Sequence, residues 1–453
     1  MPRFLLIVAL ISLGFAPRLD ATTPRGWVNQ RYAPGPPDNP LKGLVPFRGG
    51  YDAFPYSMEW DYIPWNTIQT DVDSFNWAPL EQVLDEAASR RHQVAFRIYA
   101  DYPNTPSALP AFLSGVARHA YTDSSNGQEA TSYSPDYDDP LLRRAMLNLI
   151  RALGARYDGD PRIGFITVGL LGFWGEWHTY RPSCGCDEWM PSKGMQRAVL
   201  EAYDKAFHRT RLLARYPDVG WKKDRMGFHD DSFAYQTIGR PSWMFLTRMK
   251  KVGATRQWRH EPIGGELWPA DQPCAFQVPA CSPVGQDFAS SVDATHASWI
   301  IDHYAFQTGY TDADYDRAVA GARRLGYDLF VSGVKLADTT TRDSLEVEIR
   351  VQNRGVAPFY YDWLVRLGII DSDSRLAASF NTSWKLTRVV DAGQDVKFGR
   401  KVKAHGLGPG VYTLVMQAEN PMPTGRTLAF ANADWEADAK DWLTLGTFEV
   451  GVR

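Results

Sequence analysis

The chain has 453 residues, with 49 Lys and Arg against 52 Asp and Glu, and its formal charge is −3. No basic block is present to attract a polyanion, so the composition argues against nucleic-acid binding. Hydrophobic residues make up 44% of the chain and charged residues 22%, which excludes a mainly disordered protein. Its 16 Trp, 21 Tyr and 22 Phe give a high aromatic content, and such rings supply flat faces for stacking, sugars included.

The N-terminus has the pattern of a secretory signal peptide. The apolar run from Phe4 to Phe15 suits the core of such a signal and is too short to span a bilayer. Small residues at Ala16 and Ala21 offer cleavage sites, and Pro17 disfavours the first, so we expect residues 1–21 to be removed. No later apolar stretch is long enough to cross a membrane, which predicts no stable membrane insertion and a secreted protein, periplasmic if bacterial.

Export makes the four cysteines candidates for disulfides. They occur as Cys184 and Cys186 and, further on, as Cys274 and Cys281. Three connectivities are possible, and a bridge from Cys274 to Cys281 is the most local. Neither spacing is that of a zinc site and no histidine pair lies nearby, so the sequence predicts no metal and no cofactor. It does not indicate an oligomeric state.

Residues 22–326 alternate short apolar runs with segments of helical periodicity, which predicts an α/β fold, a TIM-type (β/α)8 barrel. The absence of a nucleotide-binding glycine loop disfavours the doubly wound alternative. An eighth strand is not evident. Seven strands are expected at 43–47, 57–63, 94–99, 163–171, 225–229, 262–266 and 299–304, with helices near 77–88, 140–153 and 194–214.

Residues 327–453 have a different periodicity. Leu345, Val347, Ile349 and Val351 alternate with polar residues, as in a strand with one wet face. Further strands are expected at 363–370, 396–402, 411–418 and 442–450. This pattern predicts a C-terminal, immunoglobulin-like antiparallel β-sandwich.

In a (β/α)8 barrel the reactive groups follow the C-terminal ends of the strands. After the run 163–171, Glu176 lies between Trp174 and Trp177 and beside His178. Tryptophan side chains next to a carboxylate disfavour its charged form and raise its pKa, as a general acid near neutral pH requires.

A second carboxylate ends a later strand, where Gly264 and Gly265 precede Glu266 and Trp268 follows. Two carboxylates ringed by tryptophan match the needs of glycosidic bond cleavage, in which one group protonates the leaving oxygen and the other attacks the anomeric carbon. We therefore predict Glu176 as the acid/base and Glu266 as the nucleophile. The main rival for the nucleophile is the pair Asp230 and Asp231, which more often caps a helix.

Other polar and aromatic residues at the expected strand ends are candidates for substrate binding. Arg97 is expected either to bind a sugar hydroxyl or to hold Glu266 ionised, and a structural ion pair is an equal alternative. A segment with few apolar residues, 119–139, is expected to be a loop over the barrel mouth or a disordered insertion. The remaining candidates are Trp60, Tyr99, Trp174, Trp177, His178, His229, Trp268, His303 and Tyr304.

At these residues the chain resembles the retaining glycoside hydrolases of clan A, in which the acid/base follows the fourth strand and the nucleophile the seventh. Clan A enzymes usually carry Asn just before the acid/base, and this chain has Gly175 there. The chain is also similar to the secreted proteins of the domain-of-unknown-function family 4832. The segments that carry this second resemblance are 39–43, 172–179, 264–266, 428–432 and 445–446.

These observations predict a secreted glycoside hydrolase that acts on an oligo- or polysaccharide by a two-carboxylate, retaining mechanism. One alternative is a non-catalytic carbohydrate-binding protein on the same scaffold. The other is a polysaccharide lyase, in which Tyr99 or Tyr180 with His178 would remove a proton from a uronate. Uronate binding asks for several basic residues on the pocket floor, and the strand-end motifs offer only Arg97.

Overall fold

The computed structural model describes most of the chain. The predicted signal peptide, residues 1–21, and Cys184 lie outside the described residues. Among the described residues, no helix is long and apolar enough to cross a membrane. The described residues are 26–122, 130–180, 186–215, 225–281, 285–337, 339–340, 345–402, 407–433 and 441–451.

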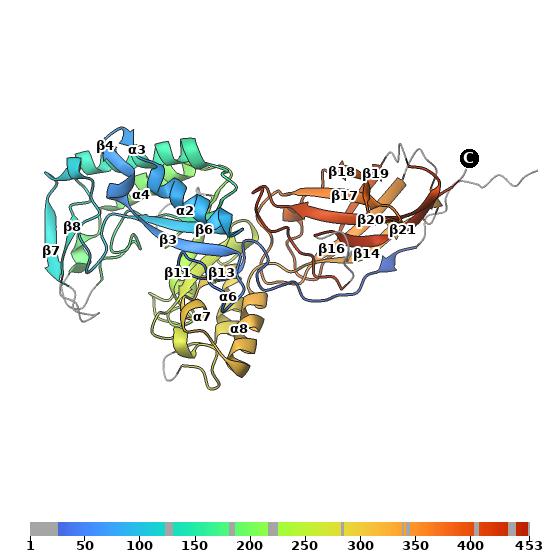
Figure 1. The fold of residues 1–453 in the computed structure, drawn as a ribbon. Helices are drawn as coiled ribbons and strands as arrows, with labels where there is room; N and C mark the ends of the chain where they lie inside the picture. The colour runs from blue at the N-terminus through green and yellow to red at the C-terminus, as the bar shows by residue number, and fades with distance from the viewer. Residues whose placement is uncertain are drawn as a thin grey trace, which may run out of the picture.

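The first large unit is a parallel eight-stranded sheet that is nearly closed into a barrel, as predicted (Figure 1). The two end strands of the sheet, which contain or precede these residues, approach each other: Arg48 N–H donates to Trp60 O and Trp60 N–H donates to Pro46 O, both at 2.8 Å. The strands, in spatial order, are β2 (Gly43–Val45), β13 (Trp299–Ile301), β12 (Ile263–Leu267), β11 (Met226–Phe233), β10 (Arg211–Ala214), β9 (Ile163–Thr167), β6 (Gln93–Tyr99) and β3 (Met58–Pro64).

The strand that sequence patterns did not reveal is β10, which lies inside the range predicted as helix 194–214. The helix α4 covers only Lys193–Ala206. It ends there because the carboxylate of Asp158 accepts the backbone N–H groups of His208, Arg209 and Thr210, which draws the chain out of the helix. The predicted helix is therefore wrong in its last turns, and the four residues of β10 are too few to show a periodicity.

The predicted strand 163–171 is also too long, since β9 ends at Thr167 and Leu170 has a positive φ of 70°. Helices pack around the barrel, and α3 begins as predicted, with the Asp139 side chain accepting the N–H groups of Leu141 and Leu142. The remaining helices are α1 (Trp65–Ile68), α2 (Ala78–Ser89), α3 (Pro140–Tyr157), α5 (Phe245–Lys251), α6 (Phe288–Thr295), α7 (Tyr304–Gln307) and α8 (Asp312–Arg324).

Segment 119–139 is not the expected loop. It holds most of a two-stranded antiparallel hairpin, β7 (Arg118–Thr122) with β8 (Thr131–Pro135). Tyr121 and Ser132 are buried, although the composition of the hairpin is polar. A shorter hairpin, β4 (Gln69–Asp71) with β5 (Ser74–Phe75), precedes α2. The predicted disulfide between Cys274 and Cys281 is confirmed, and Cys186 is also disulfide-bonded.

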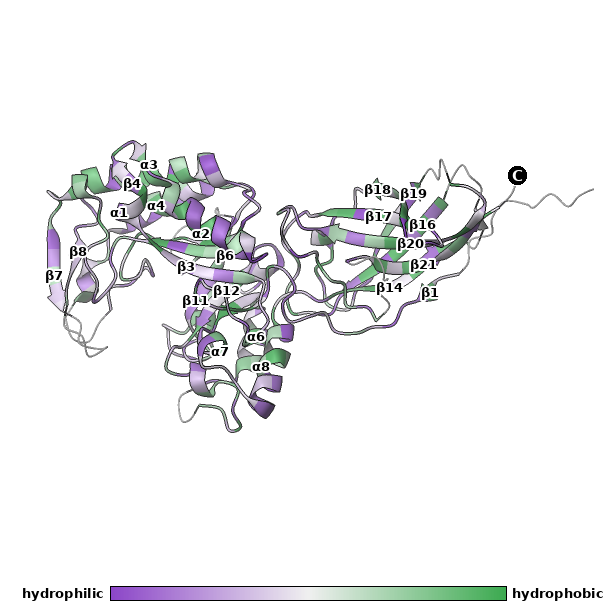
Figure 2. Cartoon of the chain, viewed as in Figure 1, coloured by the Kyte–Doolittle hydropathy of each residue, from purple (hydrophilic) through white to green (hydrophobic). Residues whose placement is uncertain are grey.

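Two sheets make up the C-terminal part, beside the barrel, and they are antiparallel except where β15 pairs in parallel with β21 (Figure 1). The strand β16 alternates buried and more exposed residues along its length, and Figure 2 shows apolar and polar residues mixed along these strands. Both sheets contribute side chains to one hydrophobic core. One sheet has the order β1 (Val28–Asn29), β14 (Leu329–Leu336), β16 (Leu345–Asn353), β19 (Val396–Val402); the other has β15 (Thr339–Thr340), β21 (Leu443–Val450), β20 (Gly410–Glu419), β17 (Leu364–Ile370), β18 (Leu376–Asn381).

The first strand of the chain belongs to the C-terminal part. β1 pairs antiparallel with β14, and Tyr32 forms a further bridge with Asn432. Gly35 N–H and the Tyr32 hydroxyl both donate to the carboxylate of Asp328, at 3.1 and 2.7 Å. The N-terminal segment therefore crosses from the C-terminal sheet to the barrel before β2 begins.

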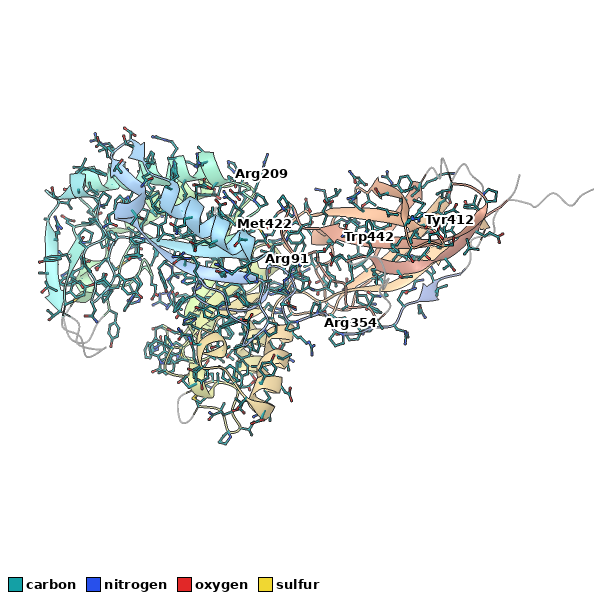
Figure 3. All side chains as sticks on the ribbon, viewed as in Figure 1. Arg91, Arg209, Arg354, Tyr412, Met422 and Trp442 are labelled. Carbon is teal, nitrogen blue, oxygen red and sulfur yellow. A yellow bond between two sulfur atoms is a disulfide. The ribbon has the colours of Figure 1, made fainter. Side chains whose placement is uncertain are left out.

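The C-terminal part covers the N-terminal end of the barrel. The Tyr361 hydroxyl donates to Gly164 O at 2.5 Å and accepts from Arg211 N–H at 3.0 Å, next to the starts of β9 and β10. Arg211 also donates to Tyr360 O at 2.7 Å. Barrel side chains such as Trp60 share one core cluster with both antiparallel sheets. A second contact joins Arg91 Nε to Thr424 O at 3.1 Å, and Figure 3 shows Arg91 where the two parts meet.

This junction predicts that the substitution Tyr361→Phe destabilises the whole chain. Gly164 O and Arg211 N–H would each lose a partner next to the buried barrel floor, at a cost of about 1–3 kcal/mol in the free energy of unfolding. Urea unfolding measures the loss. The matched control is Tyr412→Phe, because the Tyr412 hydroxyl bonds Gly408 O in an exposed position and its removal should change stability by less than about 0.5 kcal/mol. Equal stabilities of the two variants would contradict the prediction.

Candidate active site

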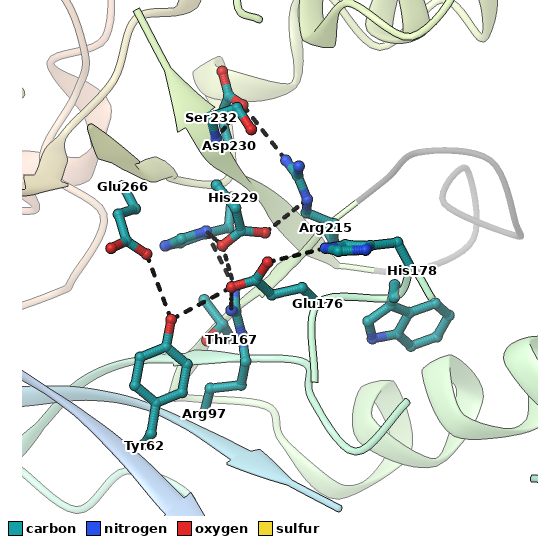
Figure 4. A network of polar contacts seen from close by, with 12 residues as sticks. Tyr62, Arg97, Thr167, Glu176, His178, Arg215, His229, Asp230, Ser232 and Glu266 are labelled. Atoms are coloured by element: carbon teal, nitrogen blue, oxygen red, sulfur yellow. Dashed lines mark hydrogen bonds and ion pairs between the residues drawn. The ribbon is translucent and has the colours of Figure 1, made fainter. Parts of the chain in front are cut away.

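The two predicted glutamates meet at the C-terminal end of the barrel, although 90 positions separate them. Glu176 lies in the turn after β9, and Glu266 is the fourth residue of β12. Counted along the chain, these are the fourth and seventh barrel strands. The hydroxyl of Tyr62, on β3, lies 3.4 Å from Glu176 Oε1 and 3.4 Å from Glu266 Oε2 (Figure 4). Only one hydrogen is available on this hydroxyl, so it donates to one carboxylate at a time.

Arg97, on β6, ties Glu176 to a third carboxylate. Its Nη1 donates to Glu176 Oε1 at 3.2 Å and its Nη2 donates to Asp231 Oδ1 at 2.8 Å. The Arg97 side chain is only 1% exposed. Burial alone would lower the pKa of its guanidinium, but the charges of Asp231 and Glu176 raise it, so Arg97 stays charged.

Beneath these groups lies a buried polar network on β11. His229 and Asp231 face the same side of this strand, and His229 Nδ1 lies 2.9 Å from Asp231 Oδ1. Arg215, just after β10, lies 2.6 Å from Asp231 through Nε and 3.4 Å from Asp230 through Nη1. Asp230 also accepts the Thr237 hydroxyl at 2.7 Å. Both aspartates therefore have partners within the chain.

The loop that carries Glu176 is held in an unusual backbone conformation. Leu170, Trp174 and Trp177 have φ values of 70°, 53° and 61°, a region that residues other than glycine rarely adopt. Gly175 has φ 70°, and a Cβ there would lie 3.0 Å from Ile98 O. Both the positive φ and this close approach favour glycine at position 175. Non-glycine residues in this region cluster at functional sites, where surrounding contacts hold them.

The carboxyl groups of the site differ in their electrostatics. Burial, together with the nearby charges of Glu176 and Asp231, raises the pKa of Glu266 to about 8, although Arg97 opposes this shift. Burial also acts on Asp231, but Arg97, Arg215 and His229 hold the pKa of its carboxyl well below the usual range. At neutral pH Glu266 is thus protonated and Asp231 is charged.

Oxygens of Glu176, Asp231 and Glu266 lie within 4.8 Å of one another. Carboxylates of this kind suit a hard divalent cation. Asp231 is already neutralised by Arg97 and Arg215, however, and the Arg97 guanidinium lies among these oxygens, where it would repel a cation. We therefore assign no metal to this group.

Aromatic rings surround the carboxylates. The Tyr102 ring contacts those of Tyr62 and Trp174 edge-on, with centroids 5.8 and 6.0 Å apart. The predicted residue Tyr99 packs against Tyr102 at 5.2 Å. On the other side, Trp268 stacks on Tyr235 with centroids 4.7 Å apart. Tyr62 and Tyr102 thus belong to a group of aromatic rings beside the carboxylates.

The other predicted residues lie at different depths. His178 Nε2 is 3.2 Å from Glu176 Oε2, so it is part of the site. Trp60 is fully buried below Arg97, and Trp177 is buried with its indole N–H on Val168 O. His303 packs against Phe47 near the mouth, and the Tyr304 ring contacts that of Tyr310.

Sequence reasoning missed Tyr62, Tyr102 and Arg215. Tyr62 is two positions after Trp60 on β3, so strand alternation places both side chains on the inside of the barrel and could have identified it. Arg215 follows β10, the strand that was not recognised, so no strand end pointed to it. Tyr102 lies in an irregular loop after β6, and no periodicity distinguishes it.

A buried carboxyl, Asp101, connects the β7–β8 hairpin to the Glu176 loop. The Tyr121 hydroxyl donates to Asp101 Oδ1 at 2.7 Å, and Tyr121 packs on Phe173 with ring centroids 4.9 Å apart. The backbone oxygen of Asp101 accepts Trp174 N–H at 2.8 Å. Burial raises the pKa of Asp101 from 3.8 to about 7.

This shift predicts a pH-dependent stability that Asp101→Asn removes. Because the folded pKa of Asp101 is raised, its contribution is fully present below about pH 4 and is lost as the pH rises through 7. Between about pH 5 and about pH 8, the wild type should lose at least about 1 kcal/mol more of its unfolding free energy than the variant. Urea unfolding at both pH values measures this difference, and parallel losses in the two proteins would contradict it.

Comparisons with known proteins give likenesses in structure only. No family model matches the chain, and no curated protein matches it. A GH5_18 protein from Streptomyces cattleya, in complex with GlcNAc, is 16% identical over 59% of this chain and 71% of that one, with a TM-score of 0.36. Endo-glycoceramidase II from Rhodococcus sp. is 12% identical over 79% and 96%, with a TM-score of 0.36. Xylanase 10B from Thermotoga maritima is 12% identical over 62% and 95%, with a TM-score of 0.34. Likenesses at this level carry no argument about activity.

Proposed function

We propose that the chain is a secreted glycoside hydrolase that cleaves an oligo- or polysaccharide with retention of configuration. The observation that carries the proposal is the approach of Glu176 and Glu266 to within reach of one hydroxyl, at the open end of an aromatic-walled barrel. Export is supported by the disulfide between Cys274 and Cys281, since such bonds persist in oxidising compartments.

The proposed mechanism uses the two carboxyl groups in different roles. Glu176 protonates the leaving oxygen, and ionised Glu266 attacks the anomeric carbon to form a glycosyl-enzyme ester. Glu176 then removes a proton from water, which hydrolyses the ester. Tyr62 donates its hydrogen bond to Glu266 while that carboxylate is charged, and Arg97 keeps Glu176 oriented.

The short distance between the carboxylates favours retention. Retaining enzymes have carboxyl groups about 5–5.5 Å apart, whereas inverting enzymes leave a wider gap for a water molecule. Oxygens of Glu176 and Glu266 lie within 4.8 Å of each other, which supports direct attack by Glu266. Proton NMR of the first product formed should show the anomeric configuration of the substrate, and inversion would contradict this mechanism.

The proposal extends to the domain organisation. Residues 22–326 would form the catalytic barrel, except that β1 (Val28–Asn29) pairs with β14 and so joins the second part. Residues 327–453 would form an immunoglobulin-like β-sandwich, which is supported by the single core that both sheets share. The contacts of Tyr361 with the barrel floor support a rigid junction between the two. Membership of clan A and of family 4832 is part of the same proposal.

Conservative replacement of either glutamate should abolish turnover. With a panel of polysaccharides and chromogenic glycosides, Glu176→Gln and Glu266→Gln should each lower kcat about 100- to 10,000-fold, because each removes one acid or base function. The matched control is Glu261→Gln, a buried glutamate that pairs with Arg211 at the opposite end of the barrel. Turnover at the wild-type rate in both active-site variants would contradict the assignment of the two glutamates. No turnover by the wild type itself would leave the non-catalytic carbohydrate-binding alternative.

The raised pKa of Glu266 predicts an alkaline pH optimum. Since the nucleophile has to be ionised, kcat/KM should rise with pH through about 8. The hydrogen bond from Tyr62 lowers this pKa, so Tyr62→Phe should move the rise to higher pH. Rate profiles of both proteins test this, and a fall in kcat/KM through pH 8 would instead identify Glu266 as the acid.

A further inference from the structure

We infer that the sugar held between Glu176 and Glu266 carries no acidic group, because both arginines at the floor of the hollow are already neutralised by carboxylates of the chain. This inference rests on the proposed function and names the class of substrate that the site accepts. It excludes uronic acids and sulfated sugars from the position where the bond is cut.

The first arginine, Arg97, has both terminal nitrogens engaged with carboxylates of the chain. One terminal nitrogen donates to Glu176 and the other donates to Asp231, at 3.2 and 2.8 Å. Its Nε is buried. A substrate carboxylate could therefore reach this guanidinium only by displacing Glu176 or Asp231, and each displacement would leave a charged group unpaired in a buried place.

The second arginine, Arg215, lies deeper and is engaged in the same way. It contacts Asp231 at 2.6 Å and Asp230 at 3.4 Å, and its side chain is 8% exposed. His178, the remaining basic group beside the glutamates in the described part of the site, directs Nε2 at Glu176 Oε2. Each basic group that contacts these carboxylates is thus paired with an acid of the chain.

The balance of charge makes the hollow unsuited to another anion. Arg97 and Arg215 are matched by Glu176 and Asp231, so these four groups leave no net positive charge. A sugar acid would lie within a few ångströms of these carboxylates, where low solvent access strengthens the repulsion between like charges. A ring that bears only hydroxyl or amide groups avoids that repulsion and can use the carboxylates as hydrogen-bond acceptors.

Matched pairs of substrates test the inference on the wild-type chain. Each pair consists of a chromogenic hexoside and the uronide of the same configuration, for example glucoside with glucuronide and galactoside with galacturonide. Turnover should be confined to the uncharged members, with kcat/KM for the acid lower by about 100-fold or more. Comparable or faster cleavage of a uronide would overturn the inference while the proposed hydrolase activity stands.

Binding separates this outcome from failure of the proposed function. If no pair is cleaved, calorimetry with uncharged and uronic oligosaccharides decides the inference by itself. Tighter binding of the acid, or binding of neither, would overturn it. Tighter binding of the uncharged oligosaccharide would support it even where hydrolysis fails.

Removing one neutralising charge should shift the preference. Asp231→Asn leaves the two arginines with one fewer partner, so affinity for the uronic oligosaccharide should rise about tenfold relative to the uncharged one. Asp302→Asn is the matched control, because Asp302 is buried at the end of β13 and bonds Tyr310. An unchanged ratio in folded Asp231→Asn would overturn the charge argument, and the wild-type pairs remain decisive if that variant does not fold.

Discussion

The active end of the barrel depends on the burial of one guanidinium. Arg97 is 1% exposed, and a charge removed from water to this degree is stable only with paired, well-oriented partners. Asp231 on β11 and Glu176 after β9 supply them, so one cation on β6 draws together side chains from three strands. The same desolvation acts on Glu266, which has no cation within ion-pair distance among the described residues and retains its proton at neutral pH.

The parts of this site that follow from the barrel rule were predictable from sequence. Glu176 and Glu266 each come at the end of an apolar run, and the C-terminal ends of parallel strands meet at one face of a barrel. The clean alternation of β16 likewise made an antiparallel C-terminal part predictable. β10 was hidden because its four residues show no period, and because Asp158, 50 positions earlier, ends the helix before it.

Long-range partnerships were beyond what the sequence reveals. No local pattern indicates that Arg97 pairs with Asp231 rather than Glu266, or that the Tyr62 hydroxyl lies between the two glutamates. The hairpin β7–β8 was predicted as a loop because its composition is polar. Its order depends on contacts such as those of Tyr121 with Asp101 and Phe173, which lie on other elements.

The pairing of β1 with β14 has a consequence for the order in which the chain assembles. Val28 pairs with Val334, so the first strand to leave the ribosome waits for about three hundred further residues before its partner exists. During synthesis this segment has no sheet to join, while the parallel strands that follow it can already assemble. The sheet that contains β1 and β14 therefore becomes complete only after every strand of the barrel has been synthesised.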